Sequence, residues 1–229
     1  RGFHTVTAAE RCAGDGIVLL RITEIFLSLQ GESTTSGLPT VFIRLTGCPL
    51  RCSYCDTAYA FTGGQQKSLE EIVSEVRGYA VDRVTVTGGE PLAQPACLDL
   101  CKTLCDQGFQ VSIETSGALS IAELDPRVTK VMDFKTPSSG EQDRNLYTNL
   151  AHILPRDEIK FVISDRADYD WTKATIVEYK LIDSAHLLLS PNHAVLHPRE
   201  LGEWILEDRL PVRLQIQLHK YLWGDVPGR

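Results

Sequence analysis

The chain has 229 residues and a net charge of −7, because 30 aspartate and glutamate residues outnumber 23 lysine and arginine residues. This length fits one α/β domain, and the negative charge without a Lys/Arg-rich run argues against nucleic acid as a direct partner. The most apolar stretch, residues 17–29, is interrupted by Arg21 and Glu24. It is too short and too polar for a membrane helix, so we expect no membrane partner.

Residues 1–16 show neither strand nor helix periodicity, and we interpret them as an N-terminal extension of no assigned role. Residues 17–229 are expected to form one domain, since no long Pro/Gly/Ser-rich linker divides them. The chain contains seven cysteines and shows no signal-peptide pattern. These features favour a reducing compartment, and we expect a cytoplasmic protein.

From Ile17 onward, short β-branched segments alternate with segments of helical period. Helices are predicted at residues 69–76 and 96–105. Strands are predicted at residues 17–29, 41–45, 83–87, 110–113, 130–134, 160–163, 186–189 and 213–217. This alternation predicts an α/β fold in which a mainly parallel sheet, with helices outside, forms a partial, incomplete TIM-like β/α barrel.

Two segments have the sequence of a helix-starting capping box. Ser68 precedes Glu71 by three residues, and Ser120 precedes Glu123 by the same spacing. In a capping box the hydroxyl and the carboxylate satisfy free amide groups of the first turn. Both segments therefore predict a helix N-terminus.

Cys48, Cys52 and Cys55 lie in the run Gly47-Cys-Pro-Leu-Arg-Cys-Ser-Tyr-Cys-Asp56. Iron-sulfur clusters are normally held by four cysteines, so a triplet without a fourth neighbour predicts a cluster with one iron open to another ligand. Two other interpretations exist. A zinc site usually takes four ligands in two separated pairs, and a disulfide would leave one thiol over.

The triplet resembles the Cys-x3-Cys-x2-Cys signature of the radical S-adenosylmethionine (SAM) superfamily, and Tyr54 before the last cysteine fits that signature. In that superfamily SAM chelates the open iron of a 4Fe-4S cluster. Gly88-Gly-Glu-Pro91 resembles the superfamily's element that binds the SAM amino group. Taken alone, this element is more simply interpreted as a tight turn.

Three further motifs narrow the resemblance. They are Leu29-Gln-Gly-Glu32 at the end of a strand, Phe42-Ile-Arg-Leu-Thr-Gly-Cys48, and Cys55-Asp-Thr57. Together with the terminal Gln217-Leu-His-Lys220, they are similar to the 7-carboxy-7-deazaguanine synthase family, and the similarity covers most of residues 22–223.

The resemblance implies a carbon-nitrogen lyase of queuosine and 7-deazapurine biosynthesis, a pathway that modifies tRNA. The reaction converts 6-carboxy-5,6,7,8-tetrahydropterin to 7-carboxy-7-deazaguanine with loss of ammonia, after reductive cleavage of SAM has produced a 5′-deoxyadenosyl radical. The implied cofactors are one 4Fe-4S cluster per subunit, SAM and Mg²⁺. The implied partners are an electron donor such as flavodoxin or ferredoxin and a second subunit in a homodimer.

The resemblance also assigns roles to single residues. Substrate contacts are expected from Leu29, Gln30, Gly31, Glu32, Arg44, Thr87, Glu114 and His219, and the Mg²⁺ ligand is Thr57. SAM contacts are expected from Tyr54, Cys55, Asp56, Gly89, Glu90, Asp133, Phe134, Lys135, Ser190, Pro191, Asn192 and His193. The chain departs from the family pattern at Asp133-Phe134, where the family has Ser-Pro, and at Ser190–His193, where it keeps only the proline.

Plainer interpretations stand beside several of these roles. A Gln or Glu after a strand is often a solvated turn, Arg44 could form a surface ion pair, Thr57 could cap its loop, and His219 could simply pack. Cys97, Cys101 and Cys105 recur every four residues. They could form a second metal site, but a buried helix face is the favoured interpretation because free cysteine packs as a small hydrophobe.

Three other functions remain open at this stage. The alternative within the superfamily is an activase that generates a glycyl radical in a partner protein. An electron-transfer protein would cycle its cluster without using SAM, and a zinc-stabilised binding module would hold zinc without sulfide.

Overall fold

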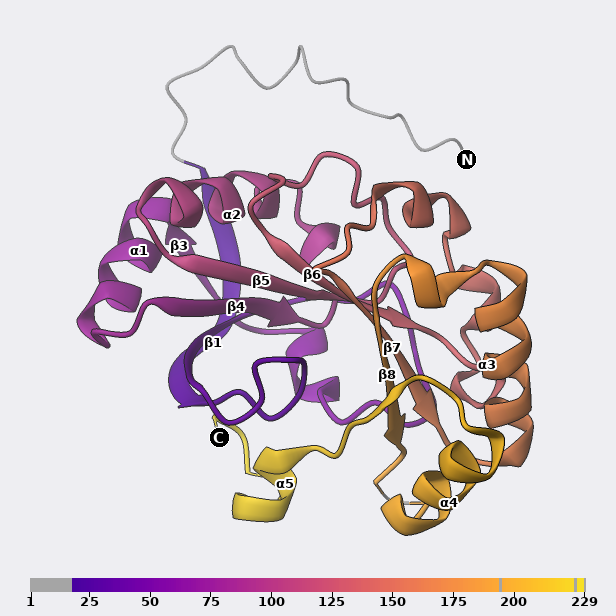
Figure 1. Ribbon diagram of the computed structural model, residues 1–229. Coiled ribbons are helices and arrows are strands. Elements are labelled where there is room, and N and C mark those ends of the chain that lie inside the picture. Colours follow the sequence, from indigo (N-terminus) through magenta and orange to yellow (C-terminus); the bar gives the residue numbers. More distant parts are fainter. Residues whose placement is uncertain (1–17, 194, 225, 229) are drawn as a thin grey trace.

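The computed structural model describes residues 18–193, 195–224 and 226–228. Ile17 and the proposed extension at residues 1–16 lie outside the described residues, so the domain boundary remains a prediction. The described chain forms one curved sheet with helices along its outer side (Figure 1).

The sheet has nine strands in the order β3-β1-β2-β4-β5-β6-β7-β8-β9 within the described part of the chain. β1 pairs antiparallel with β2 and β3, and every pair from β2 to β9 is parallel. The sheet is open between β3 and β9, so the prediction of a partial barrel is confirmed. The strands are β1 (Leu19–Leu29), β2 (Pro39–Leu45), β3 (Gln65–Ser68), β4 (Arg83–Gly88), β5 (Gln110–Thr115), β6 (Thr129–Phe134), β7 (Glu158–Ile163), β8 (His186–Pro191) and β9 (Arg213–Leu214).

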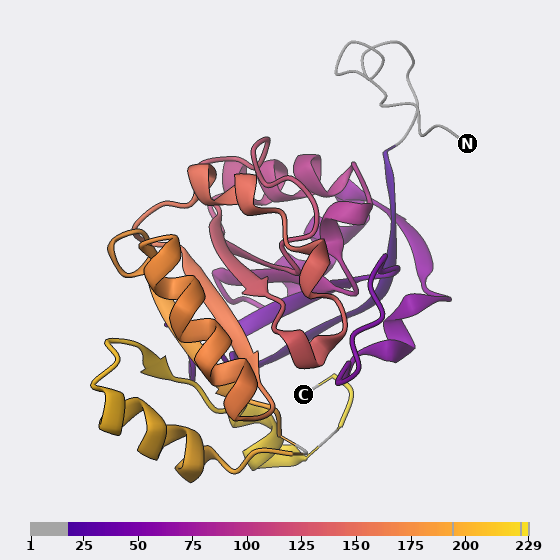
Figure 2. The same ribbon diagram turned by 90° about the vertical axis from the view of Figure 1, so that its right-hand side faces the viewer.

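Helices cover the outer face of the sheet, where α2 packs on β5, α3 on β7 and α4 on β8 (Figure 2). The helices of the described chain are α1 (Leu69–Gly78), α2 (Cys97–Asp106), α3 (Arg166–Glu178), α4 (Pro198–Asp208) and α5 (Leu218–Trp223), of which α5 lies beside the loop after β1 and not on the outer face. Short 3₁₀ helices are η2 (Ala58–Phe61), η3 (Pro91–Ala93), η4 (Pro137–Ser139), η5 (Gln142–Arg144), η6 (Tyr147–His152) and η7 (Leu181–Asp183). Among the described residues, no helix has the length and apolar composition that crossing a bilayer requires.

One capping-box prediction is confirmed and the other is wrong. The Ser68 hydroxyl accepts from the Glu71 amide, and the Ser68 amide donates to the Glu71 carboxylate, which starts α1. Residues after Ser120 form turns instead of a helix. Pro126 explains the failure, because a residue before proline is disfavoured in helical conformation. The Ile121 amide donates to the Asn149 side chain at 3.1 Å.

Strand prediction was accurate in the centre of the sheet and poor at its edges. The predicted strand at 213–217 ends at Leu214: the Gln215 amide still donates to the Leu189 carbonyl, and the chain then turns toward α5. β3 was not predicted, since Gln65–Ser68 has no β-branched or alternating pattern. Edge strands pair on one side only, and their sequences carry a weaker apolar signal.

The outer side of the sheet and the inner faces of the helices form the hydrophobic core. Cys97, Cys101 and Cys105 are all buried in it on one face of α2, with exposed fractions of 0%, 0% and 9%. The prediction that this cysteine stripe packs in the core is confirmed.

A buried ion pair joins β6 to the start of β7. Lys130 Nζ lies 2.9 Å from Asp157 Oδ2, and the two side chains are 4% and 0% exposed. Asp157 also accepts from the amides of Lys130 and Leu154. Asp157→Ala leaves a buried ammonium and two amides unpaired, so we expect the free energy of unfolding to fall by about 3–5 kcal/mol in urea titrations. Asp170→Ala, which removes an exposed helical ion pair, is the control and should change it by about 0.5 kcal/mol or less.

Candidate active site

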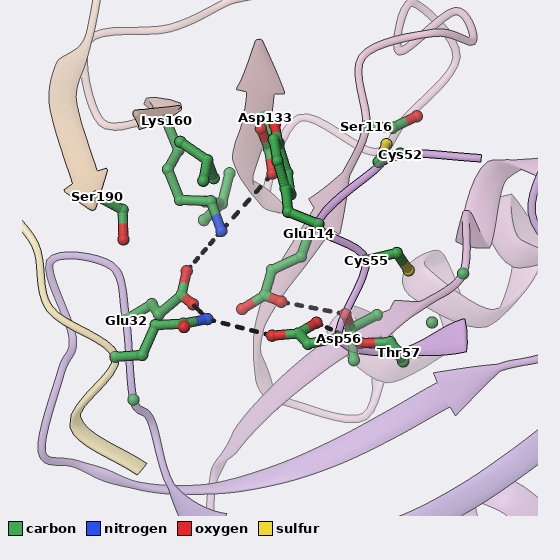
Figure 3. Close-up of a pocket in the computed structure, with 18 of the residues that line it drawn as sticks. Glu32, Cys52, Cys55, Asp56, Thr57, Glu114, Ser116, Asp133, Lys160 and Ser190 are labelled. Atoms are coloured by element: carbon green, nitrogen blue, oxygen red, sulfur yellow. Dashed lines mark hydrogen bonds and ion pairs between the residues drawn. The ribbon is translucent and has the colours of Figure 1, made fainter. Parts of the chain in front are cut away.

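A pocket lies at the carboxyl ends of the parallel strands, where side chains from consecutive strands point inward (Figure 3). Ligands bind at this edge of α/β sheets because loops and strand ends converge there. The cysteine loop after β2 forms one wall, and α5 with the loop after β1 forms another. The strands supply Arg44, Thr87, Glu114, Asp133, Lys160 and Ser190 to the pocket.

All three cysteines of the triplet line this pocket. Partial burial raises the pKa of the Cys52 thiol to about 11 and also raises that of Cys48. In the described part of the chain, no three Cys, His, Asp or Glu side chains gather closely enough to bind one metal ion. The thiols therefore do not form a site for a single metal ion in this structure.

The Gly88–Pro91 turn packs directly on the cysteine loop. A Cβ atom on Gly89 would lie 2.4 Å from the Gly47 carbonyl oxygen and 2.7 Å from Cys48 Cβ. Gly88 has φ of 155°, and a Cβ there would lie 2.3 Å from the Leu45 carbonyl oxygen. Only glycine allows this approach, so the turn and the loop form one wall.

Glu90 is fully buried, and its side chain does not line the pocket. Its carboxylate accepts hydrogen bonds from the amides of Leu92 and Ser116 and from the hydroxyls of Thr115 and Ser116. The side chain thus fixes the turn to the end of β5. A ligand contact from Glu90 would come from its main chain.

Asp133 and Lys135, at the end of β6, lie together at the wall of the pocket. Asp133 Oδ2 is 3.0 Å from Lys135 Nζ, and that ammonium lies 6.0 Å from the Tyr54 ring centroid. Asp133 Oδ1 is buried and has no hydrogen-bond partner among the described residues. Such an atom at a pocket wall is available to a ligand donor. The intervening Phe134 instead packs in the core against Tyr147 and Phe161.

Two carboxylates, Glu32 and Glu114, lie in the centre of the pocket in different surroundings. Burial acts to raise the pKa of Glu32, but the charge and hydrogen bond of Lys160 and the Gln217 amide outweigh it and lower the pKa. Burial and the charge of Glu32 raise the pKa of Glu114. Glu114 accepts from Thr87 Oγ1 at 3.1 Å and from Gln30 Nε2 at 3.4 Å.

Arg44 lines the pocket from β2, and it is also half of an ion pair. Its Nε donates to Glu24 Oε1 at 2.7 Å, and its side chain is 16% exposed. The guanidinium lies between the rings of Phe26 and Tyr59, with 5.8 Å to each centroid, and Tyr59 donates to the same Glu24 oxygen. Glu24 and the rings thereby fix Arg44 beside the pocket.

Thr57 lies next to Asp56 at the rim of the pocket. Its hydroxyl donates to Asp56 Oδ1 at 2.9 Å, and Lys220 Nζ lies 2.8 Å from Asp56 Oδ2. Burial acts to raise the pKa of Asp56, but the hydrogen bond and charge of Lys220 dominate and lower it. Thr57 and Asp56 therefore offer hard oxygen donors of the kind that Mg²⁺ prefers.

His219 on α5 closes the pocket against the loop after β1. A Cβ on Gly31 would lie 2.0 Å from His219 Nδ1, and the Leu218 amide donates to the Gly31 carbonyl at 2.9 Å. Burial lowers the pKa of His219, since the imidazolium is less well solvated there. The neutral ring is thus placed to donate or accept a hydrogen bond at the pocket.

Comparisons with known proteins agree with this geometry. Residues 42–132 match the Radical SAM superfamily model. The chain is 44% identical to 7-carboxy-7-deazaguanine synthase of Chlorobaculum tepidum over 208 residues, covering 90% of this chain and 94% of that protein. It is 42% identical to the Koribacter versatilis enzyme of the same name, with 89% and 97% covered. The chain belongs to the 7-carboxy-7-deazaguanine synthase family.

The crystal structure of QueE from Escherichia coli shares the fold of this family member, with a TM-score of 0.74, 25% identity, and coverage of 88% of this chain and 95% of that chain. The radical SAM fold is therefore shown by sequence and structure together. Membership of this family implies a 4Fe-4S cluster and SAM.

The residues of the pocket fit these two groups. A cluster needs thiolate donors with one open coordination site, and the cysteine loop supplies three thiols that face the pocket. SAM carries amino and hydroxyl donors, and the unpartnered Asp133 Oδ1 is a buried acceptor at the same wall. Of the residues expected to contact SAM or substrate, Phe134 and Glu90 alone are not pocket-lining.

Sequence reasoning missed five polar residues of this family member's pocket: Thr115, Ser116, Lys160, Gln217 and Lys220. Lys160 was placed in a strand but given no role. Its signal is strand alternation: Ile159 and Phe161 are buried in the core, so Lys160 must point to the opposite, concave face. Gln217 and Lys220 belong to the terminal motif from which only His219 was selected.

Proposed function

We propose that this chain converts 6-carboxy-5,6,7,8-tetrahydropterin to 7-carboxy-7-deazaguanine and releases ammonia. The observation that carries this proposal is that one pocket brings together the cysteine loop, the Gly88–Pro91 turn and the polar residues of both terminal motifs. The relatives named above bear the name of this activity.

The pocket residues suit a flat bicyclic substrate with an amide-like edge and a carboxylate. Glu32, Glu114 and Gln30 offer paired hydrogen-bonding groups to the edge, and Arg44 offers a fixed cation to the carboxylate. When bound, the cluster and SAM supply the radical chemistry. The protein's part is to hold the substrate in one orientation and to exclude water, which the packing of α5 on Gly31 achieves on one side.

We also propose that Thr57 binds Mg²⁺, which would hold the substrate carboxylate. Thr57→Ala should raise the Mg²⁺ concentration for half-maximal activity at least about 10-fold, because even residues outside a metal's ligand shell contribute 10–100-fold to affinity. Activity titrations with Mg²⁺ measure this effect. Thr62→Ala, at the end of η2 and outside the pocket lining, is the control. An identical titration curve for Thr57→Ala would reject the role.

The cellular context is likewise a proposal from the family. We infer a homodimer located in the cytoplasm and reduced by flavodoxin or ferredoxin. Sedimentation of the reconstituted protein tests the dimer, and turnover with each donor in place of dithionite tests the reductant.

The decisive experiment is anaerobic reconstitution with iron and sulfide, followed by incubation with SAM, dithionite, Mg²⁺ and 6-carboxytetrahydropterin. Formation of 7-carboxy-7-deazaguanine and an equal amount of ammonia is expected. Turnover in the absence of any other protein would exclude the activase alternative. Reductive SAM cleavage that is not stimulated by the carboxypterin would reject the proposed substrate.

A further inference from the structure

A lysine lies in the middle of the pocket, between its two carboxylate-bearing walls. Lys160 Nζ is 2.5 Å from Glu32 Oε2 and 3.7 Å from Asp133 Oδ2, and the lysine side chain is 14% exposed (Figure 3). Glu32 belongs to the loop after β1, on the substrate side. Asp133 belongs to β6, on the side expected to bind SAM.

The sheet fixes this position. Lys160 pairs with Asp133 across β7 and β6, so both side chains point to the same concave face. On β7, Val162 lines the pocket beside Lys160, and Glu158 lies on the same face and accepts from the Thr34 amide and hydroxyl. A lysine that reaches from a central parallel strand into a pocket is held by backbone pairing on both sides, which limits its movement.

None of the other cations of the pocket pairs with Glu32. Arg44 pairs with Glu24 and Lys220 with Asp56, whereas Lys135 shares Asp133 with Lys160. Within the described residues, the ion pair of Glu32 is with Lys160, and the hydrogen bond from Gln217 Nε2 at 2.8 Å completes its surroundings.

Glu114 faces Glu32, Lys160 and Arg44, yet its hydrogen bonds come from the neutral groups of Thr87 and Gln30. The two central carboxylates therefore differ in one respect that matters for binding: Glu32 has a cation in direct contact. An ionised carboxylate accepts hydrogen bonds, whereas a protonated one can also donate.

We propose that Lys160 is a positioning residue, which fixes the orientation and charge of Glu32 toward the substrate and connects Glu32 to Asp133 at the SAM side. Glu32 then serves as an acceptor for the N–H groups of the pterin edge. This proposal rests on the proposed function, since it assigns a pterin to the pocket.

The test is a double-mutant cycle in the reconstituted holoenzyme with Lys160→Met, Glu32→Gln and the double variant. Each single change should raise the KM for 6-carboxytetrahydropterin roughly 10- to 100-fold, as expected for loss of a charge-assisted hydrogen bond. The KM of the double variant should exceed the larger of the two single-variant KM values by no more than about threefold, because the two residues act as one unit. Multiplication of the two effects, or a wild-type KM for Lys160→Met, would overturn the proposal.

A second measurement needs no cofactor: the unfolding free energy of the cofactor-free full chain against pH. The lowered pKa of Glu32 contributes stability above its unfolded pKa, and this is lost as pH falls through the folded pKa. Without Lys160, burial and the charges of Glu114 and Asp56 raise that pKa, and the hydrogen bond from Gln217 and the charge of His219 oppose them. The loss of unfolding free energy caused by Lys160→Met, relative to the wild type, should therefore grow from about pH 4 to pH 7. In the Glu32→Gln background the same substitution should cause a loss that does not change with pH.

Two variants separate positioning from folding. Lys160→Arg keeps the cation and should retain the wild-type pH dependence. Lys173→Met removes a partly exposed ion pair with Asp208 outside the pocket and should leave KM unchanged. If Lys160→Met lowers the unfolding free energy by the same amount at every pH, Lys160 only packs in the pocket and the proposal is overturned. If the wild type forms no deazaguanine while the pH dependence is as expected, the coupling of Lys160 to Glu32 stands and the assigned reaction fails.

Discussion

Cys52→Ala should abolish formation of 7-carboxy-7-deazaguanine while leaving the fold intact. Cys52 lies at the pocket between the other two cysteines of the loop, and its side chain contributes nothing to the hydrophobic core. Without Cys52 only two thiolates of the loop remain, and two thiolates would not hold a 4Fe-4S cluster in the position in which its open iron can bind SAM. We expect a loss of at least about 1,000-fold in turnover, which corresponds to about 4 kcal/mol.

Three measurements distinguish loss of the cluster from loss of the fold. Iron and sulfide content should drop in the reconstituted variant, the spectroscopic response of the reduced cluster to SAM should disappear, and circular dichroism should remain unchanged. Cys101→Ala is the matched control, because Cys101 is buried in α2 and lies outside the pocket. It should lower stability but retain the cluster. Full iron content and turnover in Cys52→Ala would remove this residue from the ligand set.

The central strands could be predicted from sequence because parallel strands are buried on both faces. Val84 and Val86 on β4 and Ile159 and Phe161 on β7 are almost fully buried, and β-branched or aromatic runs of this kind have few other interpretations. The connections were harder. The segment after Ser120 carries a complete capping-box pattern, but Pro126 and the side chain of Asn149, distant in sequence, decide its conformation.

Candidate site residues were predictable where a motif has a fixed spacing, and they were missed where tertiary contacts give them their role. The cysteine loop and the strand-end residues Glu32 and Glu114 were found in this way. Lys160 gains its role only because Glu32, far away in the chain, folds back to within hydrogen-bonding distance. Glu90 shows the opposite case. Its motif predicts a cofactor contact, but its carboxylate accepts hydrogen bonds from the end of β5 and the following loop.

Gly89→Ala should disable the site through sterics alone. The added Cβ would lie 2.4 Å from the Gly47 carbonyl oxygen and 2.7 Å from Cys48 Cβ, and backbone atoms cannot yield without moving the cysteine loop. A displacement of about 1 Å at a reacting site can reduce rates roughly 100-fold. We expect at least that loss in turnover, together with weaker binding of SAM to the reconstituted cluster.

Gly78→Ala at the end of α1 is the control for the general effect of replacing a glycine by alanine, because nothing lies within 4 Å of the added Cβ there. This control should keep full activity and gain up to about 1 kcal/mol of stability, because alanine favours a helix over glycine. The measurements are SAM affinity, turnover and urea unfolding. Since the clash involves the loop and not the catalytic chemistry, Gly89→Ala should lose SAM affinity even when its iron content is normal. Wild-type SAM affinity in a fully loaded Gly89→Ala protein would show that the turn and the cysteine loop move independently.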